Sequence, residues 1–210
     1  MARNKSAKQK KFETEDNDWG CINWCEYMIV ITLTSLLLIS TVSLVLFWAL
    51  YYREGFAWRD NPQKEFNLHP VLMVTGFIFF SGFSLLLYRI CRCCRRLYVK
   101  LGHAILHSLA IPCIVLGFLA VWDSKNLSQP KGTNFYSLHS WLGLVTIGLF
   151  LVQFLVGFFS FLILICCQGK TKSCRAGLVP IHSSFGITIY MLAVATCLTG
   201  FAEKAIYTLG

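Results

Sequence analysis

The sequence predicts an all-α membrane protein, a bundle of five transmembrane helices. Of its 210 residues, 56% are apolar and only 14% are charged, whereas about 25% of the residues of a soluble domain carry charge. Five mostly apolar stretches hold about 20 residues or more, and at about 1.5 Å per residue each can cross about 30 Å of hydrocarbon. The stretches cover about 27–50, 69–90, 101–122, 140–167 and 180–202.

Positive charges collect at one predicted membrane face. The net charge of +9 would suit a nucleic-acid-binding protein, but 13 of the 19 lysines and arginines fall at one end of the five stretches and 6 at the other. Cytoplasmic loops carry the excess of Lys and Arg, so we expect the richer face and the N-terminus to be cytosolic, and we expect no nucleic-acid partner. The richer face carries Arg3, Lys5, Lys8, Lys10, Lys11, Arg89, Arg92, Arg95, Arg96, Lys100, Lys170, Lys172 and Arg175, and the other carries Arg53, Arg59, Lys64, Lys125, Lys131 and Lys204.

The chain outside the apolar stretches predicts a simple domain plan. Residues 1–26 are polar and are expected to form a disordered cytosolic tail, and residues 27–210 are expected to form the membrane domain. No short apolar segment with a cleavage site precedes the first stretch, so we expect no cleaved signal peptide. Asn126-Leu127-Ser128 is a glycosylation sequon on the non-cytosolic side, which agrees with this orientation.

The ten cysteines do not indicate an extracellular disulfide framework, because none lies in a predicted non-cytosolic loop. Cys113 and Cys197 lie within apolar stretches, and the other eight fall at the predicted cytosolic face. The cysteines beside the membrane are either palmitoylation sites or unreactive thiols, and the sequence leaves both open. The eight are Cys21, Cys25, Cys91, Cys93, Cys94, Cys166, Cys167 and Cys174.

Four of the five histidines stand at the ends of successive apolar stretches: His69, His103, His139 and His182. Successive membrane helices run in opposite directions, so the first and third lie at one face and the second and fourth at the other. An ionisable side chain within a membrane span is costly and indicates function by default, although a single histidine there would more often be a hydrogen-bonded packing residue. Four at corresponding depths favour two metal-binding pairs stacked across the membrane.

Haem explains the two pairs better than zinc does. Neutral imidazole is an axial ligand of haem iron, and two imidazoles leave no open coordination position, which suits electron transfer. Zinc would need four clustered ligands, preferably with cysteine, whereas each face offers two histidines. Cys91 and Cys94 form the one CxxC and no CxxCH occurs, so we expect non-covalent haem. A histidine-based proton or metal transporter is a further hypothesis, which predicts transport without a haem spectrum.

Small residues and the fifth histidine lie close to the four histidines in the sequence. His107 follows His103 by one helical turn and is interpreted as a pocket residue, with replacement of His103 as a ligand or a bond to a neighbouring helix as alternatives. Glycines near the pairs would admit a flat macrocycle, or would serve only the close packing of membrane helices. They are Gly143 and Gly186, each four residues after a histidine, and Gly76, seven residues after one.

Six motifs lie between residues 41 and 210: Tyr52-Arg53-Glu54-Gly55, Phe66-Asn67-Leu68-His69-Pro70, Leu87-Tyr88-Arg89, Tyr136-Ser137-Leu138-His139-Ser140-Trp141, Pro180-Ile181-His182 and Gly200-Phe201-Ala202-Glu203-Lys204. Together they resemble the cytochrome b561 family, the transmembrane ascorbate-dependent reductases, and are most similar to the animal members of the chromaffin-granule, lysosomal and duodenal types. The family plan has six helices. This chain contains five, with the four haem-bearing helices complete.

The resemblance implies two non-covalent b haems in a four-helix core formed by the second to fifth stretches. One haem lies near the non-cytosolic face between His69 and His139, and the other lies near the cytosolic face between His103 and His182. No side chain is assigned a catalytic role. Family positions that contact ascorbate match Arg96, Lys100 and Arg175. Those that contact the haems match Arg89 and Arg96 at the cytosolic face, and Asn134, Phe135, Tyr136, Ser137 and Glu203 at the other.

The charges suit these implied roles. Ascorbate is an anion at neutral pH, and arginines and lysines at the membrane face would gather it. For Arg92 and Arg95 we favour the plain excess of positive charge in cytosolic loops. Glu203 lies 21 residues after His182, about 31 Å along a helix, which puts it at the opposite face.

The expected function is an oxidoreductase that passes electrons from cytosolic ascorbate, through irons roughly 20 Å apart, to monodehydroascorbate or a ferric chelate on the far side. The alternative is a short five-helix form that binds haem or a full-length partner and regulates it without reductase activity. The sequence leaves open the acceptor and whether the chain forms a homodimer. It also leaves open whether its lipid environment is the plasma membrane or an endosomal, lysosomal or secretory-vesicle membrane.

Overall fold

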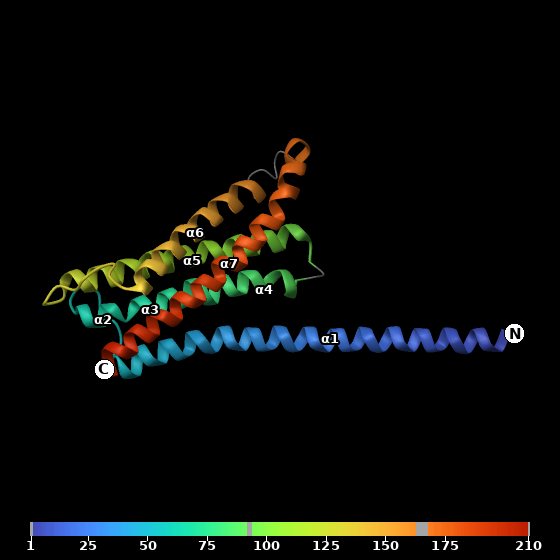
Figure 1. The fold of residues 1–210 in the computed structure, drawn as a ribbon, viewed down its shortest axis with the longest axis horizontal. Coiled ribbons are helices and arrows are strands. Elements are labelled where there is room, and N and C mark those ends of the chain that lie inside the picture. Colours follow the sequence, from blue (N-terminus) through green and yellow to red (C-terminus); the bar gives the residue numbers. More distant parts are fainter. Residues whose placement is uncertain (1, 92–93, 163–167, 210) are drawn as a thin grey trace. The chain divides into compact units, whose positions relative to one another are not determined.

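The computed structural model describes residues 2–91, 94–162 and 168–209, and within them all regular structure is helical (Figure 1). The chain divides into two units, residues 1–37 and 38–210, of which the first is the N-terminal part of α1. Everything described below belongs to the second unit unless stated. The elements in chain order are α1 (Ala2–Phe47), η1 (Trp48–Tyr52), α2 (Pro62–Phe66), α3 (Leu68–Met73), η2 (Val74–Phe80), α4 (Ser81–Ile90), α5 (Arg96–Leu127), α6 (Leu138–Phe161) and α7 (Gln168–Leu209).

Five helical segments are long and apolar enough to cross a membrane, which confirms the predicted all-α, multi-pass architecture. Four of the five are longer than the apolar stretch that predicted them, because helices continue into polar residues that can cap them. The fourth, Leu138–Phe161, has 24 residues and ends before its predicted stretch 140–167 does. The second span, for example, begins at Pro62 after the Asn61 side chain accepts hydrogen bonds from the backbone N–H groups of Gln63 and Lys64. The spans are Trp24–Tyr52, Pro62–Ile90, Arg96–Leu127, Leu138–Phe161 and Thr171–Thr208.

The first helix begins earlier than its apolar stretch. α1 starts at Ala2, whereas the apolar residues start near position 27. That residues 1–26 form a disordered tail stays a prediction.

Apolar side chains cover the outside of the helices, as expected of a protein whose solvent is lipid. Val152 on α6 and Met191 on α7 are 59% and 60% exposed. In a water-soluble protein a surface made of such residues would be a liability. In a multi-pass membrane protein these exposed apolar side chains face lipid.

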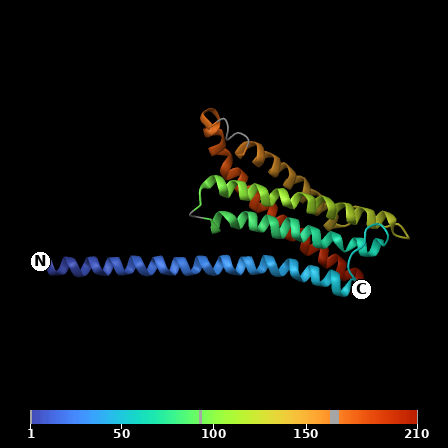
Figure 2. The same cartoon turned by 180° about the vertical axis from the view of Figure 1, so that it is seen from behind.

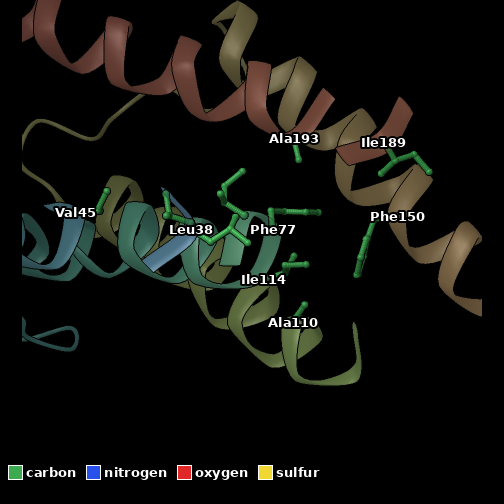
Figure 3. Packing of buried hydrophobic residues seen from close by; sticks show 10 residues of the cluster. Leu38, Val45, Phe77, Ala110, Ile114, Phe150, Ile189 and Ala193 are labelled. Carbon is green, nitrogen blue, oxygen red and sulfur yellow. The ribbon is translucent and has the colours of Figure 1, made fainter. Parts of the chain in front are cut away.

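The interior joins all five spans through a small cluster of buried side chains, to which α1 contributes Leu38 and Val45 (Figure 3). The rings of Phe77 on η2 and Phe150 on α6 lie edge to face with centroids 5.3 Å apart, and Ile114 of α5 and Ala193 of α7 are buried beside them. Along the bundle, α4 packs on α5 and α6 packs on α7, and Figure 2 shows both pairs from behind. This packing brings the four histidine-bearing spans together.

Candidate functional site

The first histidine pair joins α3 to α6. The rings of His69 and His139 lie with centroids 6.0 Å apart and planes at 81°. The Nδ1 atom of His69 lies 2.9 Å from the carbonyl oxygen of Gly117, and that of His139 lies 3.0 Å from the carbonyl oxygen of Thr196. A carbonyl can only accept a hydrogen bond, so each Nδ1 carries the proton and each Nε2 keeps a free lone pair.

The second pair joins α5 to α7. The rings of His103 and His182 lie 6.3 Å apart. The Nδ1 atom of His103 lies 2.7 Å from the Ser84 hydroxyl and 3.2 Å from the Ser84 carbonyl oxygen. The buried Nδ1 of His182 has no hydrogen-bond partner within the described part of the chain. The Gln153 amide instead donates to the backbone carbonyl of His182, 2.5 Å away.

The spacing within each pair fits one metal ion held from two sides. If two imidazoles bound one ion from opposite sides, two metal–nitrogen bonds of about 2.0 Å, with about 1.1 Å from each nitrogen to its ring centre, would put the ring centroids about 6 Å apart. The observed values are 6.0 and 6.3 Å. Among the described residues no three His, Cys, Asp or Glu side chains cluster for a metal, so a closed four-ligand zinc site does not fit. Two axial histidines fit haem iron.

The distance between the pairs follows from the helices that they share. On α7, Thr196 lies 14 residues after His182, and on α5, Gly117 lies 14 residues after His103. Thr196 and Gly117 bond the rings of the other pair. Fourteen helical residues rise about 21 Å, so both helices give the same separation, close to the predicted 20 Å.

Glycines make room for two of the rings. A Cβ built on Gly157 would lie 2.6 Å from Cε1 of His182, and one on Gly200 would lie 2.7 Å from Cε1 of His139. Of the three glycines singled out in the sequence, Gly143 lines the cavity described below. The other two serve helix packing, because Gly76 faces the Ala110 carbonyl and Gly186 faces Gln153.

A cavity of about 290 Å³ opens beside the His69–His139 pair, with both rings in its lining. Four residues implied by the family resemblance also line it: Asn134, Phe135, Tyr136 and Glu203. Ser137 is not among the lining residues. Its side chain caps α6 instead, accepting a hydrogen bond from the backbone N–H of Ser140. A contact between Ser137 and haem stays a prediction, and the neighbouring Ser140 lines the cavity.

Several lining residues were not predicted. Lys125 lies over the Tyr136 ring at 5.2 Å, and Lys204 lies over the Phe66 ring at 5.0 Å. The Tyr136 and Tyr207 hydroxyls lie 2.8 Å apart, and this hydrogen bond raises the pKa of Tyr136 above the ordinary tyrosine value. In the sequence Lys125 was visible only as one of the sparse far-face charges, and Lys204 only as the last residue of a family motif, with no spacing that tied either to a histidine.

The basic residues implied to bind ascorbate or the cytosolic haem lie at the opposite end of the bundle. Arg89 is in the last turn of α4, Arg96 is the first residue of α5 and Lys100 follows one turn later. The Tyr88 ring, next to Arg89, lies 5.3 Å from the His103 ring. Arg175 lies seven residues before His182 on α7, about 10 Å along the helix. All four thus stand at the His103–His182 end. Arg92, Cys93, Cys166 and Cys167 lie outside the described residues.

His107 lies one turn deeper than His103. Its ring is 4.6 Å from the His103 ring and 5.6 Å from the Phe150 ring, and its buried Nδ1 has no partner among the described residues. It therefore lies beside the pair, on the side of the bundle core. Its role as a pocket residue stays a prediction.

In a comparison with models of protein families, the model for eukaryotic cytochrome b561 matches residues 68–208. The chain belongs to the cytochrome b561 family. The matched range contains both histidine pairs, so the family resemblance inferred from the motifs is confirmed.

Individual family members are similar over most of the chain. A rat plasma membrane ascorbate-dependent reductase, CYBRD1, is 39% identical over 181 residues, which is 84% of this chain and 61% of the relative. The human transmembrane ascorbate-dependent reductase CYB561 is 38% identical, covering 86% of this chain and 68% of the relative. Transmembrane ascorbate ferrireductase 2 of Arabidopsis thaliana is 40% identical over 167 residues, covering 79% and 69%. The chain thus spans about three fifths to two thirds of the length of these b561 relatives.

Proposed function

We propose that the chain passes single electrons across a membrane, from ascorbate at the cytosolic face to monodehydroascorbate or a ferric chelate at the other. The observation that carries the proposal is the geometry of the two histidine pairs. Each pair holds its rings about 6 Å apart, and the pairs are separated by about 21 Å along two helices. Relatives named as ascorbate-dependent reductases support the choice of donor.

His69 with His139, and His103 with His182, would each hold one b haem. Bis-imidazole haem supplies a one-electron couple with no open coordination position. The protein contributes fixed ring orientation, through Nδ1 hydrogen bonds on three of the four histidines. It also contributes an apolar interior around Phe77 and Phe150.

At the donor end, positive side chains would hold the substrate. The ascorbate monoanion that loses one electron and one proton becomes monodehydroascorbate, which is again an anion. Arg96, Lys100 and Arg175 can therefore bind both forms through charge-assisted hydrogen bonds. Arg96 is exposed, so a released proton can pass directly to water.

At the acceptor end, the cavity beside His69 and His139 would admit the oxidant. Lys125 and Lys204 line it, and positive charge there favours an anion such as monodehydroascorbate or ferric citrate. The name of the Arabidopsis relative, a ferrireductase, supports the ferric chelate. The rat relative's name supports a plasma membrane location over an endosomal, lysosomal or vesicle membrane.

The test is electron transfer across a sealed membrane. Purified protein is reconstituted into liposomes loaded with ascorbate, ferric citrate is added outside, and ferrous iron is measured with an impermeant chelator. We expect ferrous iron only with the protein present, and none with the His139→Ala variant. Absence of ferrous iron from vesicles whose protein carries both haems would contradict the proposal.

A further inference from the structure

His103 has a partner that the other paired histidines lack, the hydroxyl of Ser84. Ser84 is on α4 and is fully buried. Its Oγ lies 2.7 Å from Nδ1 of His103 and 3.1 Å from the backbone carbonyl oxygen of the same histidine. One serine side chain therefore touches both the ring and the backbone of a predicted iron ligand.

The two contacts fix the direction of the hydrogen bonds. The carbonyl of His103 can only accept, so the single hydroxyl proton of Ser84 goes to it. The oxygen of the hydroxyl is then left to accept from the ring, which puts a proton on Nδ1 and leaves the lone pair of Nε2 free for iron. The Ser84 carbonyl, 3.2 Å from Nδ1, is a second acceptor for the same proton.

The remaining paired histidines are held differently. His69 and His139 bond only to backbone carbonyls, and Nδ1 of His182 has no partner within the described residues. The ring of His103 is thus hydrogen-bonded by a side chain, that of Ser84. Substitution at position 84 can therefore change one ligand of one pair, which substitution at a backbone acceptor cannot do.

We propose that Ser84 is a positioning residue that selects the ligating tautomer of His103 and lowers the reduction potential of the iron held between His103 and His182. An acceptor on Nδ1–H makes the imidazole a more basic ligand, and a more basic ligand favours ferric over ferrous iron. The inference rests on the proposed function, because it requires haem at this pair.

The test is a redox titration of the purified haem-loaded protein, with the low-spin ferric EPR signals recorded beside it. In Ser84→Ala we expect one of the two midpoint potentials to rise, by up to a tenfold change in the reduction equilibrium, or about 59 mV for one electron. The EPR signal that disappears in His182→Ala should be the one that shifts. Ser81→Ala is the matched control, since Ser81 is buried one turn earlier on α4 and donates to the Gly76 carbonyl, not to a histidine.

The outcomes separate this inference from the proposed function. If the wild type holds two haems, and the midpoint potentials and EPR signals of Ser84→Ala equal those of Ser81→Ala, the role of Ser84 would be overturned and the proposed function would stand. A wild-type protein without haem would overturn the proposed function. If Ser84→Ala does not accumulate, Ser84→Cys keeps the volume and leaves only a weak acceptor. A rise at the same haem in that variant supports the inference, and an unchanged potential contradicts it.

Discussion

The smallest residues of the chain decide whether two of the histidine rings fit. Gly157 on α6 faces the His182 ring, and Gly200 on α7 faces the His139 ring, each closer than a Cβ would allow. A methyl group at either position must push the ring away from its partner across the pair. Iron coordination tolerates little such movement, so these glycines belong to the site although they bind nothing themselves.

We predict that Gly157→Ala displaces His182 and lowers the haem content from about two to about one per chain. Gly148→Ala on the same helix is the control, because a Cβ there meets nothing within 4 Å and should leave haem content unchanged. Pyridine haemochrome quantification measures both variants. Full haem content in Gly157→Ala would show that the ring has room that the structure does not give it.

Lys100 is predicted to strengthen the binding of ascorbate, the electron donor. Lys100 lies one turn before His103 on α5. In Lys100→Ala we expect the ascorbate concentration for half-maximal reduction to rise about fivefold, because about 1 kcal/mol of charge interaction is lost. Stopped-flow absorbance with ascorbate measures it. Lys131→Ala, which removes an exposed charge at the other face, should behave as wild type, and an equal effect in both variants would rule out a local role.

At the residue scale, the sequence predicted the site residues that recur at regular positions and missed those that do not recur. The four histidines recur at the ends of apolar stretches, so their pairing could be predicted before the structure. Ser84 and Gly157 lie inside apolar helices with no spacing that relates them to His103 or His182. Their roles depend on which helices are neighbours, which a single sequence does not state.

At the scale of the elements, the Asn67 side chain connects the end of α2 to the segment before it. Asn67 is fully buried. Its amide nitrogen donates to the carbonyls of Arg53 and Gly55, at 3.0 and 2.7 Å, and its oxygen accepts from the Arg53 side chain at 3.3 Å. Gly55 has φ +84°, a conformation that glycine adopts at little cost. This arrangement fixes the chain two residues before His69.

We predict that Asn67→Ala destabilises the protein by about 1–3 kcal/mol for each buried group left unpaired and lowers the melting temperature by several degrees. Thermal unfolding in detergent, followed by the haem absorbance, provides the measurement. Gln63→Ala serves as the control, because Gln63 is exposed and its side chain makes no hydrogen bond among those described for this segment. Equal melting temperatures in the two variants would show that the hydrogen bonds of Asn67 to Arg53 and Gly55 do not stabilise the protein.

The five membrane spans were predicted in number and order, but the residues at which they begin and end were not. Hydropathy locates the apolar middle of a membrane helix, because that part must match the bilayer. The polar turns at the ends carry no such requirement. For example, α2 and the cap by Asn61 extend the second span to Pro62, whereas its apolar stretch begins near residue 69.

At the scale of the whole molecule, the separation of the two histidine pairs predicts that a substitution in one pair removes its haem and leaves the other haem bound. In His139→Ala we expect one haem per chain that ascorbate still reduces, but no reduction of ferric citrate across a vesicle membrane. In His182→Ala we expect the remaining haem to be reduced by dithionite and only slowly by ascorbate. The ascorbate-reduced and dithionite-reduced difference spectra of each variant provide the comparison. Loss of both haems in either variant would mean that the pairs are not independent.

The most direct test of the account is the absorption spectrum of the purified wild-type chain, oxidised and then reduced with ascorbate, with haem quantified per chain. The two imidazole pairs, with ring centroids 6.0 and 6.3 Å apart, predict two b haems per chain and a sharp reduced α-band that appears with ascorbate alone. A chain that binds no haem, or binds haem that ascorbate does not reduce, would contradict it.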